Sequence, residues 1–249
     1  MRILLTNDDG VRATGLAALE RTLEGLGHLD VVAPDRERSA SGHSLTITQP
    51  LRVARIDDRH WAVSGTPTDA VLLAIEKILP ERPDWIISGI NHGPNMGEDV
   101  TYSGTVAAAM EGAILGIPAI AVSLAGRGDL QFDAVRVPLR ALLERLLQYK
   151  LQRLQLLNVN VPNLPAGQIR GTRVSRLGSR VYRDAVVARQ DPQGRDYYWI
   201  GGTGPDWLPD EKSDAHAVEQ GYIAVTPLST DLTHYQALVD LEAHFERWP

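Results

Sequence analysis

Apolar positions in this chain follow two periods, and both appear near its start. Ile3–Leu5 is a short apolar run that leads into two adjacent carboxylates, Asp8 and Asp9. Leucines three or four positions apart over residues 14–26 predict an amphipathic helix. A second apolar run follows at residues 29–33. The order of strand, helix and strand predicts a βαβ unit with a right-handed crossover.

The same alternation continues to about residue 165 and predicts an α/β fold with a mostly parallel sheet. Thr66, Pro67 and Asp69 are a helix start with an N-cap residue, a proline and an acid in the first turn. The predicted strands lie at residues 61–63, 84–90, 117–124 and 154–161, an extended or hairpin segment lies at 45–56, and the predicted helices lie at 66–79, 104–112 and 132–149.

The pattern changes after residue 166. Residues 168–201 alternate as strands do, with a turn at Asp191–Gly194 and a return strand at Tyr197–Ile200. Exposed Tyr and Trp on such a hairpin arm favour burial against another subunit, over a solvent-facing ribbon or a border of the site. The remaining predicted elements are a helix at 213–220, a strand at 222–227 and a terminal helix at 235–248.

Composition narrows the classes of function. The 249 residues carry a net charge of −6, which argues against a groove for duplex nucleic acid because such a groove needs a basic face. The chain has no cysteine, so disulfides and thiolate metal sites are excluded. Any metal must therefore be held by oxygen or imidazole.

Neither a leader peptide nor a membrane span is expected. The apolar run at Ile3–Leu5 is too short for the apolar region of a signal peptide. The longest apolar stretch, residues 114–125, is broken by Gly116 and Pro118. We therefore expect a cytoplasmic protein that makes no contact with a membrane.

Oxygen-bearing side chains follow three of the predicted strands. Asp8 and Asp9 follow the first, Ser39 the second, and Asn91 the strand at 84–90. In a parallel sheet these positions meet at the carboxyl edge, where open α/β proteins bind ligands. The set suits a hard divalent ion, Mg²⁺ or Mn²⁺, and Ca²⁺ is also compatible. The alternative is that the two acids only form a turn or cap a helix.

A candidate anion site lies close to the candidate metal site in this scheme. Ser103, Gly104 and Thr105 stand at the start of an alanine-rich helix, where free N–H groups and the helix dipole favour a phosphate. Ordinary capping by Ser103 is the simpler interpretation, and the two are compatible. A metal beside an anion cradle is typical of phosphoryl chemistry. The glycine fingerprint of dinucleotide-binding proteins is missing after the first strand.

Motifs along nearly the whole chain stand in an order shared with a known family. They are Ile3–Gly10, Val32–Ser39, Gly42–Thr46, Gly65–Asp69, Ile87–Gly97, Tyr102–Val106, Glu111–Gly112 and Thr226–Thr233. In these motifs the chain resembles the SurE (survival protein E) nucleotidases. Ala40 replaces a glycine common in that family, which affects the detail of the loop more than the role of Ser39.

This resemblance implies a cytoplasmic phosphomonoesterase that uses one divalent metal ion per subunit. Its substrates would be nucleoside 5′- and 3′-monophosphates, with short polyphosphate in some members, and a metal-activated water would attack phosphorus. By the same resemblance, the metal ligands fall on Asp8, Asp9, Ser39 and Asn91, the catalytic residues on Asp8, Asp9 and Asn91, and the phosphate-binding residues on Asn95, Ser103, Gly104 and Thr105.

The resemblance also implies an architecture. We expect one domain over residues 1–249, with a Rossmann-like three-layer core over about residues 1–165. Residues 166–249 would supply the hairpin arm, a return strand and a C-terminal helix, which exchange between subunits in a homodimer or homotetramer.

Two other functions remain open from the residues. An aspartyl-phosphate phosphatase would use Asp8 as nucleophile, although such enzymes usually space their two acids one residue apart. A non-catalytic nucleotide-binding regulatory protein would bind its ligand without turnover, although paired acids repel a phosphate unless a metal intervenes.

The histidines in loops are weaker candidates. A lone loop histidine is most often a polar surface residue, which is the interpretation for His43. His92, beside Asn91, is a hypothetical general acid for the leaving oxygen. Asp231 and His234 are expected to tie the C-terminal segment to a neighbouring subunit. Glu98 and Asp99 are interpreted as residues that keep their loop soluble.

Overall fold

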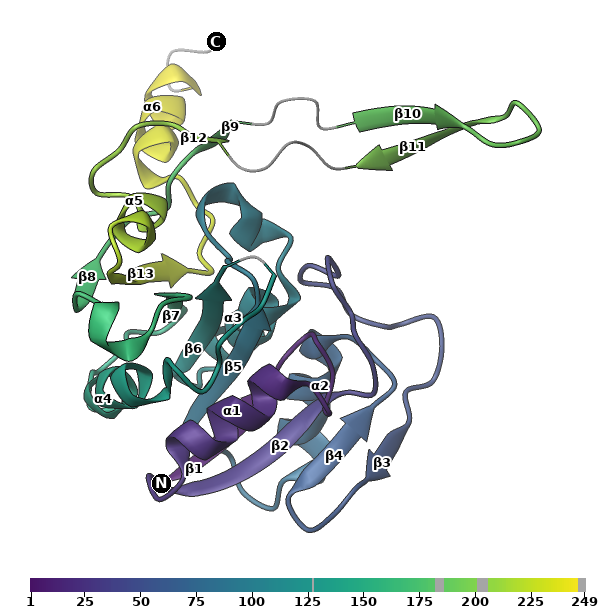
Figure 1. Ribbon diagram of the computed structural model, residues 1–249, viewed down its shortest axis with the longest axis vertical. Helices are drawn as coiled ribbons and strands as arrows, with labels where there is room; N and C mark the ends of the chain where they lie inside the picture. The colour runs from purple at the N-terminus through teal and green to yellow at the C-terminus, as the bar shows by residue number, and fades with distance from the viewer. Residues whose placement is uncertain (127, 182–185, 201–205, 246–249) are drawn as a thin grey trace.

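A nine-stranded sheet forms the centre of the molecule (Figure 1). The computed structural model describes residues 1–126, 128–181, 186–200 and 206–245. The strand order is β3-β4-β2-β1-β5-β6-β7-β13-β8, and the run from β4 to β7 is parallel throughout. The α/β fold with a mostly parallel sheet is therefore confirmed. The strands are β1 Arg2–Thr6, β2 His28–Pro34, β3 Val53–Arg55, β4 His60–Val63, β5 Trp85–His92, β6 Ala119–Ala125, β7 Gln155–Pro162, β8 Thr172–Val174 and β13 Ile223–Ser229.

Helices cover both faces of this sheet and give three layers (Figure 1). On one face, α1 (Thr14–Leu23) and α4 (Arg136–Leu146) pack their leucines on the strands. On the other, α2 (Pro67–Leu73), its π-helical continuation η1 (Ala74–Ile78) and α3 (Gly104–Ile114) enclose a second apolar cluster. Burial of these two clusters supplies the main driving force for folding.

Two helices are shorter than their apolar periodicity predicts. The first ends at Leu23 and not at residue 26, because Gly25 takes a φ of +83° and ends the helix before Gly27. The helix predicted over residues 132–149 begins at Arg136. Pro138 explains that start, since a proline is tolerated only in the first turn of a helix.

The predicted start of the second helix, α2, is confirmed, and it also anchors a loop of the site. Thr66 Oγ1 accepts from Asp69 N at 3.1 Å, and Asp69 Oδ2 accepts from Thr66 N at 2.8 Å, which is a capping box. The other oxygen of Asp69 accepts from Thr46 N at 3.0 Å. The loop that carries Ser39 is thus tied to the body of the fold.

Residues after the core extend the same sheet. Strand β13 runs antiparallel to β7, and β8 pairs in parallel with β13. The predicted strand at 222–227 and helix at 213–220 are present as β13 and α5. The predicted terminal helix is present as far as Phe245, and its last predicted residues lie outside the described part of the chain. The other elements are η2 Gly97–Thr101, η3 Ala166–Gln168, β9 Arg180–Val181, β12 Asp206–Trp207, α5 Asp214–Glu219 and α6 Tyr235–Phe245.

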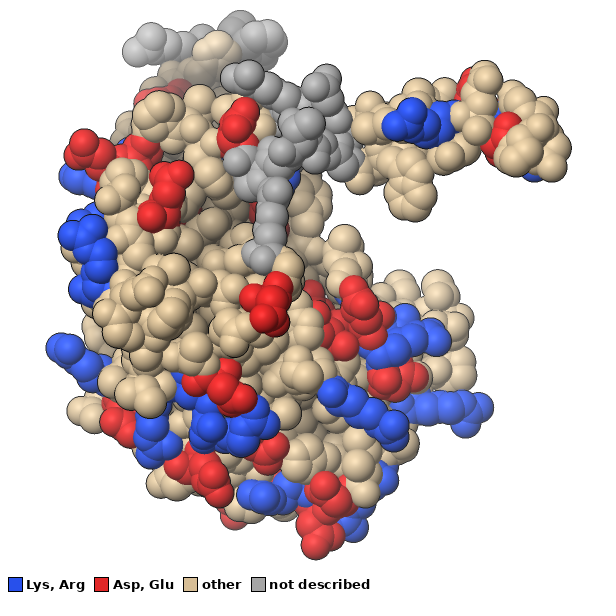
Figure 2. Space-filling view, in the orientation of Figure 1, with Lys and Arg blue, Asp and Glu red and all other residues tan. Residues whose placement is uncertain are grey.

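The predicted hairpin arm is present and projects away from the body (Figure 1). It consists of β10 (Val186–Gln190) and β11 (Asp196–Ile200), which pair antiparallel. Gly194 N donates to the carbonyl of Asp191 at 2.9 Å and closes the predicted turn. Every residue of both strands is exposed. Figure 2 shows side chains of both charges on the visible face of the arm, as on the body.

In the part of the chain that the structure describes, none of the helices has both the length and the apolar character needed to cross a membrane.

Candidate active site

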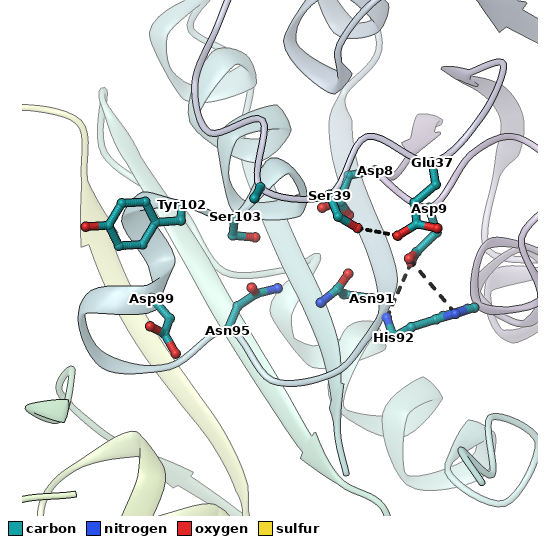
Figure 3. A pocket seen from close by; sticks show the side chains of 11 residues that line it. Asp8, Asp9, Glu37, Ser39, Asn91, His92, Asn95, Asp99, Tyr102 and Ser103 are labelled. Atoms are coloured by element: carbon teal, nitrogen blue, oxygen red, sulfur yellow. Dashed lines mark hydrogen bonds and ion pairs between the residues drawn. The ribbon is translucent and has the colours of Figure 1, made fainter. Parts of the chain in front are cut away.

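One polar cavity of about 320 Å³ lies at the carboxyl edge of the parallel strands. Its lining comes from four segments: the end of β1, the loop after β2, the end of β5 with η2, and the start of α3. Six of the eight predicted site residues line it, and Gly104 and Thr105 lie directly behind Asp8. Figure 3 shows the side chains facing one another across the gap. The lining residues are Asp8, Asp9, Glu37, Ser39, Ala40, Asn91, His92, Asn95, Asp99, Tyr102 and Ser103.

The turn after β1 is fixed by an asparagine. Asn7 Nδ2 donates to the carbonyl of Gly10 at 3.0 Å, and Gly10 N donates to Asn7 Oδ1 at 3.2 Å. Gly10 takes a φ of +101°, which a side chain would disfavour. Arg38 N donates to the carbonyl of Asp8 at 2.7 Å and joins this turn to the loop after β2. These bonds hold Asp8 and Asp9 at the sheet edge.

The carboxylate of Asp8 is buried against the start of α3. Thr105 Oγ1 donates to Asp8 Oδ1. A Cβ atom at Gly104 would lie 2.7 Å from Asp8 Cβ and 2.9 Å from Asp8 Oδ2, so only glycine allows this approach. Burial raises the pKa of Asp8, and its bonds from Thr105 oppose the rise. Thr105 therefore supports Asp8 directly, a contact that the sequence did not suggest.

Asp9 is less enclosed and faces His92. The backbone N of His92 donates to Asp9 Oδ2 at 3.3 Å, and His92 Nδ1 lies 4.0 Å from Asp9 Oδ1. Burial, followed by the negative charge of Asp8, raises the pKa of Asp9 to about 6. Two carboxylates whose ionisation is disfavoured in this way gain most from a neighbouring cation.

Ser39 lines the cavity together with Glu37, an acid that was not identified from the sequence. Its hydroxyl donates to Glu37 Oε1 at 2.6 Å, and both side chains line the cavity (Figure 3). Glu37 stands two positions before Ser39 in a loop that was already predicted to reach this edge. This position could have identified Glu37 as a site residue from the sequence. It is a weak indication, because acidic residues are common in loops.

Asn91 and Asn95 lie across the gap from Asp8 and Ser39 (Figure 3). The pairing of β5 with β6 shifts register between Ser88 and Asn91. Such irregularities re-aim side chains beside active sites. Asn91 Nδ2 donates to the carbonyl of Gly93 at 2.9 Å, which fixes the orientation of its amide.

A buried pair of asparagines on β7 holds Asn95. The side chains of Asn158 and Asn160 donate to the carbonyl of Asn95 at 2.8 and 2.9 Å, and Asn160 Oδ1 accepts from Asn95 N at 2.9 Å. Asn95 Nδ2 donates to Ser123 Oγ at 2.8 Å. Sequence reasoning missed this network. Asn158 and Asn160 are two positions apart in an apolar run, so both side chains lie on the same face of a buried strand. Buried amides need hydrogen-bond partners, and this pattern could have indicated the network.

The charge of the cavity is negative. Four of its lining residues are acids, and among the described residues that line it there is no Lys or Arg. No group of three or more His, Asp and Glu side chains in the described residues is placed to hold a metal ion. A metal at Asp8 and Asp9 would therefore rely on neutral oxygens such as those of Ser39 and Asn91, and a phosphate could not approach without a cation.

Comparisons with known proteins show the family of the chain. The sequence matches the family described as Survival protein SurE over residues 3–184. The chain belongs to the SurE family. It is 56% identical over 242 residues to the "5'-nucleotidase SurE" of Gemmatimonas aurantiaca, covering 96% of each chain. It is 50% identical over 244 residues to the protein of that name from Geobacter sulfurreducens, covering 98% of this chain and 93% of the relative.

A solved SurE structure has the same fold. The crystal structure of the SurE protein from Aquifex aeolicus superposes with a TM-score of 0.89 at 44% sequence identity, and the match covers 98% of this chain and 99% of that one. Membership of the SurE family, which the motifs indicated, is therefore confirmed over nearly the whole length.

Three of the seven histidines of this SurE chain were candidates from the sequence, and they occupy three different environments. His92 lines the cavity, and its ring lies 4.9 Å from that of Phe132. His43 pairs with the buried Glu111 at 2.8 Å and ties the Ser39 loop to α3. His234 Nδ1 accepts from Ala237 N at 3.0 Å at the start of α6. Of the three, only His92 lies where it could take part in chemistry.

Proposed function

We propose that this SurE-family chain is a divalent-metal-dependent phosphomonoesterase that hydrolyses nucleoside 5′-monophosphates to nucleoside and phosphate. One observation carries the proposal: two desolvated carboxylates, Asp8 and Asp9, share a polar cavity with the start of α3. The relatives named 5'-nucleotidase SurE support this substrate class.

Asp8, Asp9, Ser39 and Asn91 would hold one metal ion per subunit. The residues fit such an ion because all four offer oxygen, and because burial raises the pKa of both acids. Mg²⁺ and Mn²⁺ are the proposed ions, and Ca²⁺ is compatible with the same ligands. When bound, such an ion polarises a phosphoryl oxygen and lowers the pKa of a water molecule that attacks phosphorus.

Asn95, Ser103, Gly104 and Thr105 would bind the phosphate group. Ser103 Oγ accepts from Val106 N at 3.1 Å and caps α3, so the helix dipole is directed at the cavity. The lack of a side chain at Gly104 keeps the backbone open to a phosphate. Thr105 would act mainly through Asp8, to which its hydroxyl donates.

A proton for the leaving oxygen would come from His92. It is the one histidine among the described lining residues of the cavity, and its backbone and ring both face Asp9. Thr14 Oγ1 lies 3.4 Å from its Nε2 and helps to orient the ring.

The same site would accept 3′-monophosphates and short polyphosphate, since the metal and phosphate ligands read only the phosphoryl group. Hydrolysis of 5′-AMP, 5′-GMP, 3′-AMP and tripolyphosphate with Mn²⁺ or Mg²⁺ tests this range. We expect EDTA to abolish turnover of all of them. Full activity of Asp8→Asn would overturn the proposal, with Asp30→Asn at the opposite, amino-terminal end of the sheet as a matched control.

The aspartyl-phosphate alternative makes a different stereochemical prediction. If Asp8 were the nucleophile, two successive displacements at phosphorus would give net retention of configuration with a chiral, isotopically labelled thiophosphate monoester, whereas direct attack by water gives inversion. We expect inversion. A non-catalytic regulatory protein, the other alternative, would bind AMP and release no phosphate at all.

The chain would work as a homo-oligomer. The arm exposes 66% of Trp199 and 90% of Ile200, and α6 exposes 54% of Leu241 and 65% of Phe245. Apolar surface of this extent on the arm and on α6 calls for a partner, and a second copy is the proposed one. Light scattering after size-exclusion chromatography would give the mass of a dimer or tetramer. A cytoplasmic location, as expected from the sequence, stays a prediction.

A further inference from the structure

The loop that carries Asn95 is attached to the C-terminal part of the chain by a buried aspartate. Asp214, at the start of α5, accepts from Gly97 N at 3.0 Å through Oδ2. Its Oδ1 accepts from Gly178 N at 2.9 Å and from Ala215 N at 2.8 Å. Burial raises the pKa of Asp214, and the three N–H donors oppose that rise. One side chain thus joins η2, the segment before β9, and α5.

The attachment is close-packed around Gly97. This residue takes a φ of +55°, and a Cβ atom there would lie 2.6 Å from the ring of Trp207 and 2.7 Å from the carbonyl of Gly178. Trp207 belongs to β12, which pairs with β9. The loop is therefore seated against the small β9–β12 sheet, whose strands flank the arm in the sequence.

We call the contacts of Asp214 with Gly97 the first clasp. A second clasp, made by Arg180, holds the next two residues of the loop. Arg180 N donates to Glu98 Oε2 at 2.7 Å, and Arg180 Nη1 forms an ion pair with Asp99. Asp99 itself lines the cavity. Glu98 and Asp99 therefore do more than keep the loop soluble, which corrects the interpretation from the sequence.

We propose that Asp214 and Arg180 are positioning residues for the phosphate subsite, acting through the loop from Asn95 to Ser103. The inference rests on the proposed function and deepens it. The contacts of Asp214 and Arg180 hold residues 97–99, which connect Asn95 to Ser103, so they limit how far these two phosphate-binding residues can move relative to each other.

The proposed metal ligands lie outside this attachment. Asp8 and Asp9 follow β1, Ser39 follows β2, and Asn91 ends β5, and none of them contacts Asp214 or Arg180 through a hydrogen bond or ion pair in the described residues. Loosening the clasps should therefore weaken binding of phosphate and leave binding of the metal unchanged.

Asp214→Asn breaks the attachment selectively. An asparagine that keeps its oxygen toward Gly178 and Ala215 turns its NH₂ group toward Gly97 N–H, so two donors face each other and the loop is released. We expect the KM for AMP and the inhibition constant of inorganic phosphate to rise together by roughly tenfold, with kcat changed by less than about threefold. Mn²⁺ affinity in calorimetry should equal that of the wild type.

Arg180→Gln is the second variant, because its side chain is partly exposed and the change should not prevent folding. It should raise the same two constants by roughly threefold. Arg176→Gln is its matched control, since Arg176 makes an equivalent ion pair with Asp210 at 2.9 Å without touching the loop. Asp30→Asn controls for the loss of a buried carboxylate.

The KM for AMP, the inhibition constant of phosphate and the Mn²⁺ affinity together distinguish a positioning role from a purely structural one. Variants that lose activity only in proportion to their lost folded fraction, with unchanged KM and unchanged inhibition by phosphate, would overturn the inference. So would an equal rise of KM in Arg176→Gln. A wild-type protein that binds Mn²⁺ and phosphate without hydrolysing AMP would instead refute the proposed function, while phosphate affinity would still test the clasps.

Discussion

Replacing Asp9 by asparagine should make the metal-free protein more stable while removing its response to metal. Burial and the charge of Asp8 raise the pKa of Asp9 from its ordinary value of 3.8 to about 6. Ionisation of Asp9 therefore lowers the free energy of unfolding of the metal-free protein. Asparagine has nearly the same shape and its oxygen can still accept from His92 N, so the substitution removes the charge and little else.

The size of the effect follows from the pKa of Asp9. One pKa unit corresponds to about 1.36 kcal/mol, so the rise corresponds to roughly 3 kcal/mol of lost stability once Asp9 is ionised. Because the carboxylate is partly exposed, we halve this to about 1.5 kcal/mol. For a chain of this length that is a gain of about 3–6 °C in Tm for the variant.

The effect has a defined pH dependence. A carboxylate with a raised folded-state pKa contributes stability that is fully present below its unfolded pKa, and that is lost as pH rises through the folded pKa. The wild type should therefore lose stability relative to Asp9→Asn between about pH 4 and pH 6, and the difference should be constant above that range.

Thermal unfolding at pH 7.5 in EDTA measures the stability of the metal-free protein, and a second measurement in saturating Mn²⁺ gives its response to metal. Mn²⁺ should raise the Tm of the wild type and leave Asp9→Asn unchanged. Asp58→Asn, at an exposed carboxylate, is the control and should stay within about 0.5 kcal/mol of the wild type. A variant that is no more stable than the wild type in EDTA, or that is stabilised equally by Mn²⁺, would refute the reasoning.

Three further predictions concern the cavity and the arm. Gly104→Ala should lower kcat/KM by roughly 100-fold, because the added Cβ meets a site carboxylate; steady-state kinetics with Gly167→Ala, where the space is open, checks this. His92→Gln should flatten the alkaline limb of the pH–rate profile, and an unaltered profile would exclude His92 as general acid. Trp199→Ser combined with Ile200→Ser should reduce the mass measured by light scattering, whereas an unchanged mass would place the interface elsewhere.

The order of elements was predictable because it depends on local signals. The run Ile3–Leu5, followed by turn residues, is typical of a buried strand, and side chains that follow a parallel strand lie at the carboxyl edge of its sheet. The capping signature at Thr66 and the turn at Asp191–Gly194 are equally local. Two predicted helix boundaries were wrong. Gly25 ends the first helix at Leu23, and Pro138 restricts the start of α4 to Arg136.

The supports of the site could not be found in this way. Asn160 and Asn95 are 65 positions apart, and Asp214 and Gly97 are 117 apart. No periodicity links such residues, since their meeting depends on how β7 and α5 pack against the loop. The candidate ligands were found because each follows a strand, whereas the residues that hold them become recognisable only once the sheet order is known.

The central claim is that a metal ion at Asp8 and Asp9 is required for hydrolysis of nucleoside monophosphates. The most direct measurement is phosphate release from AMP as Mn²⁺ is titrated into EDTA-treated protein, beside calorimetric binding of Mn²⁺ to the same sample. We predict that rate and binding saturate together with one ion per subunit, and that Asp8→Asn loses both. Turnover that persists without metal, or that survives in Asp8→Asn, would contradict the account.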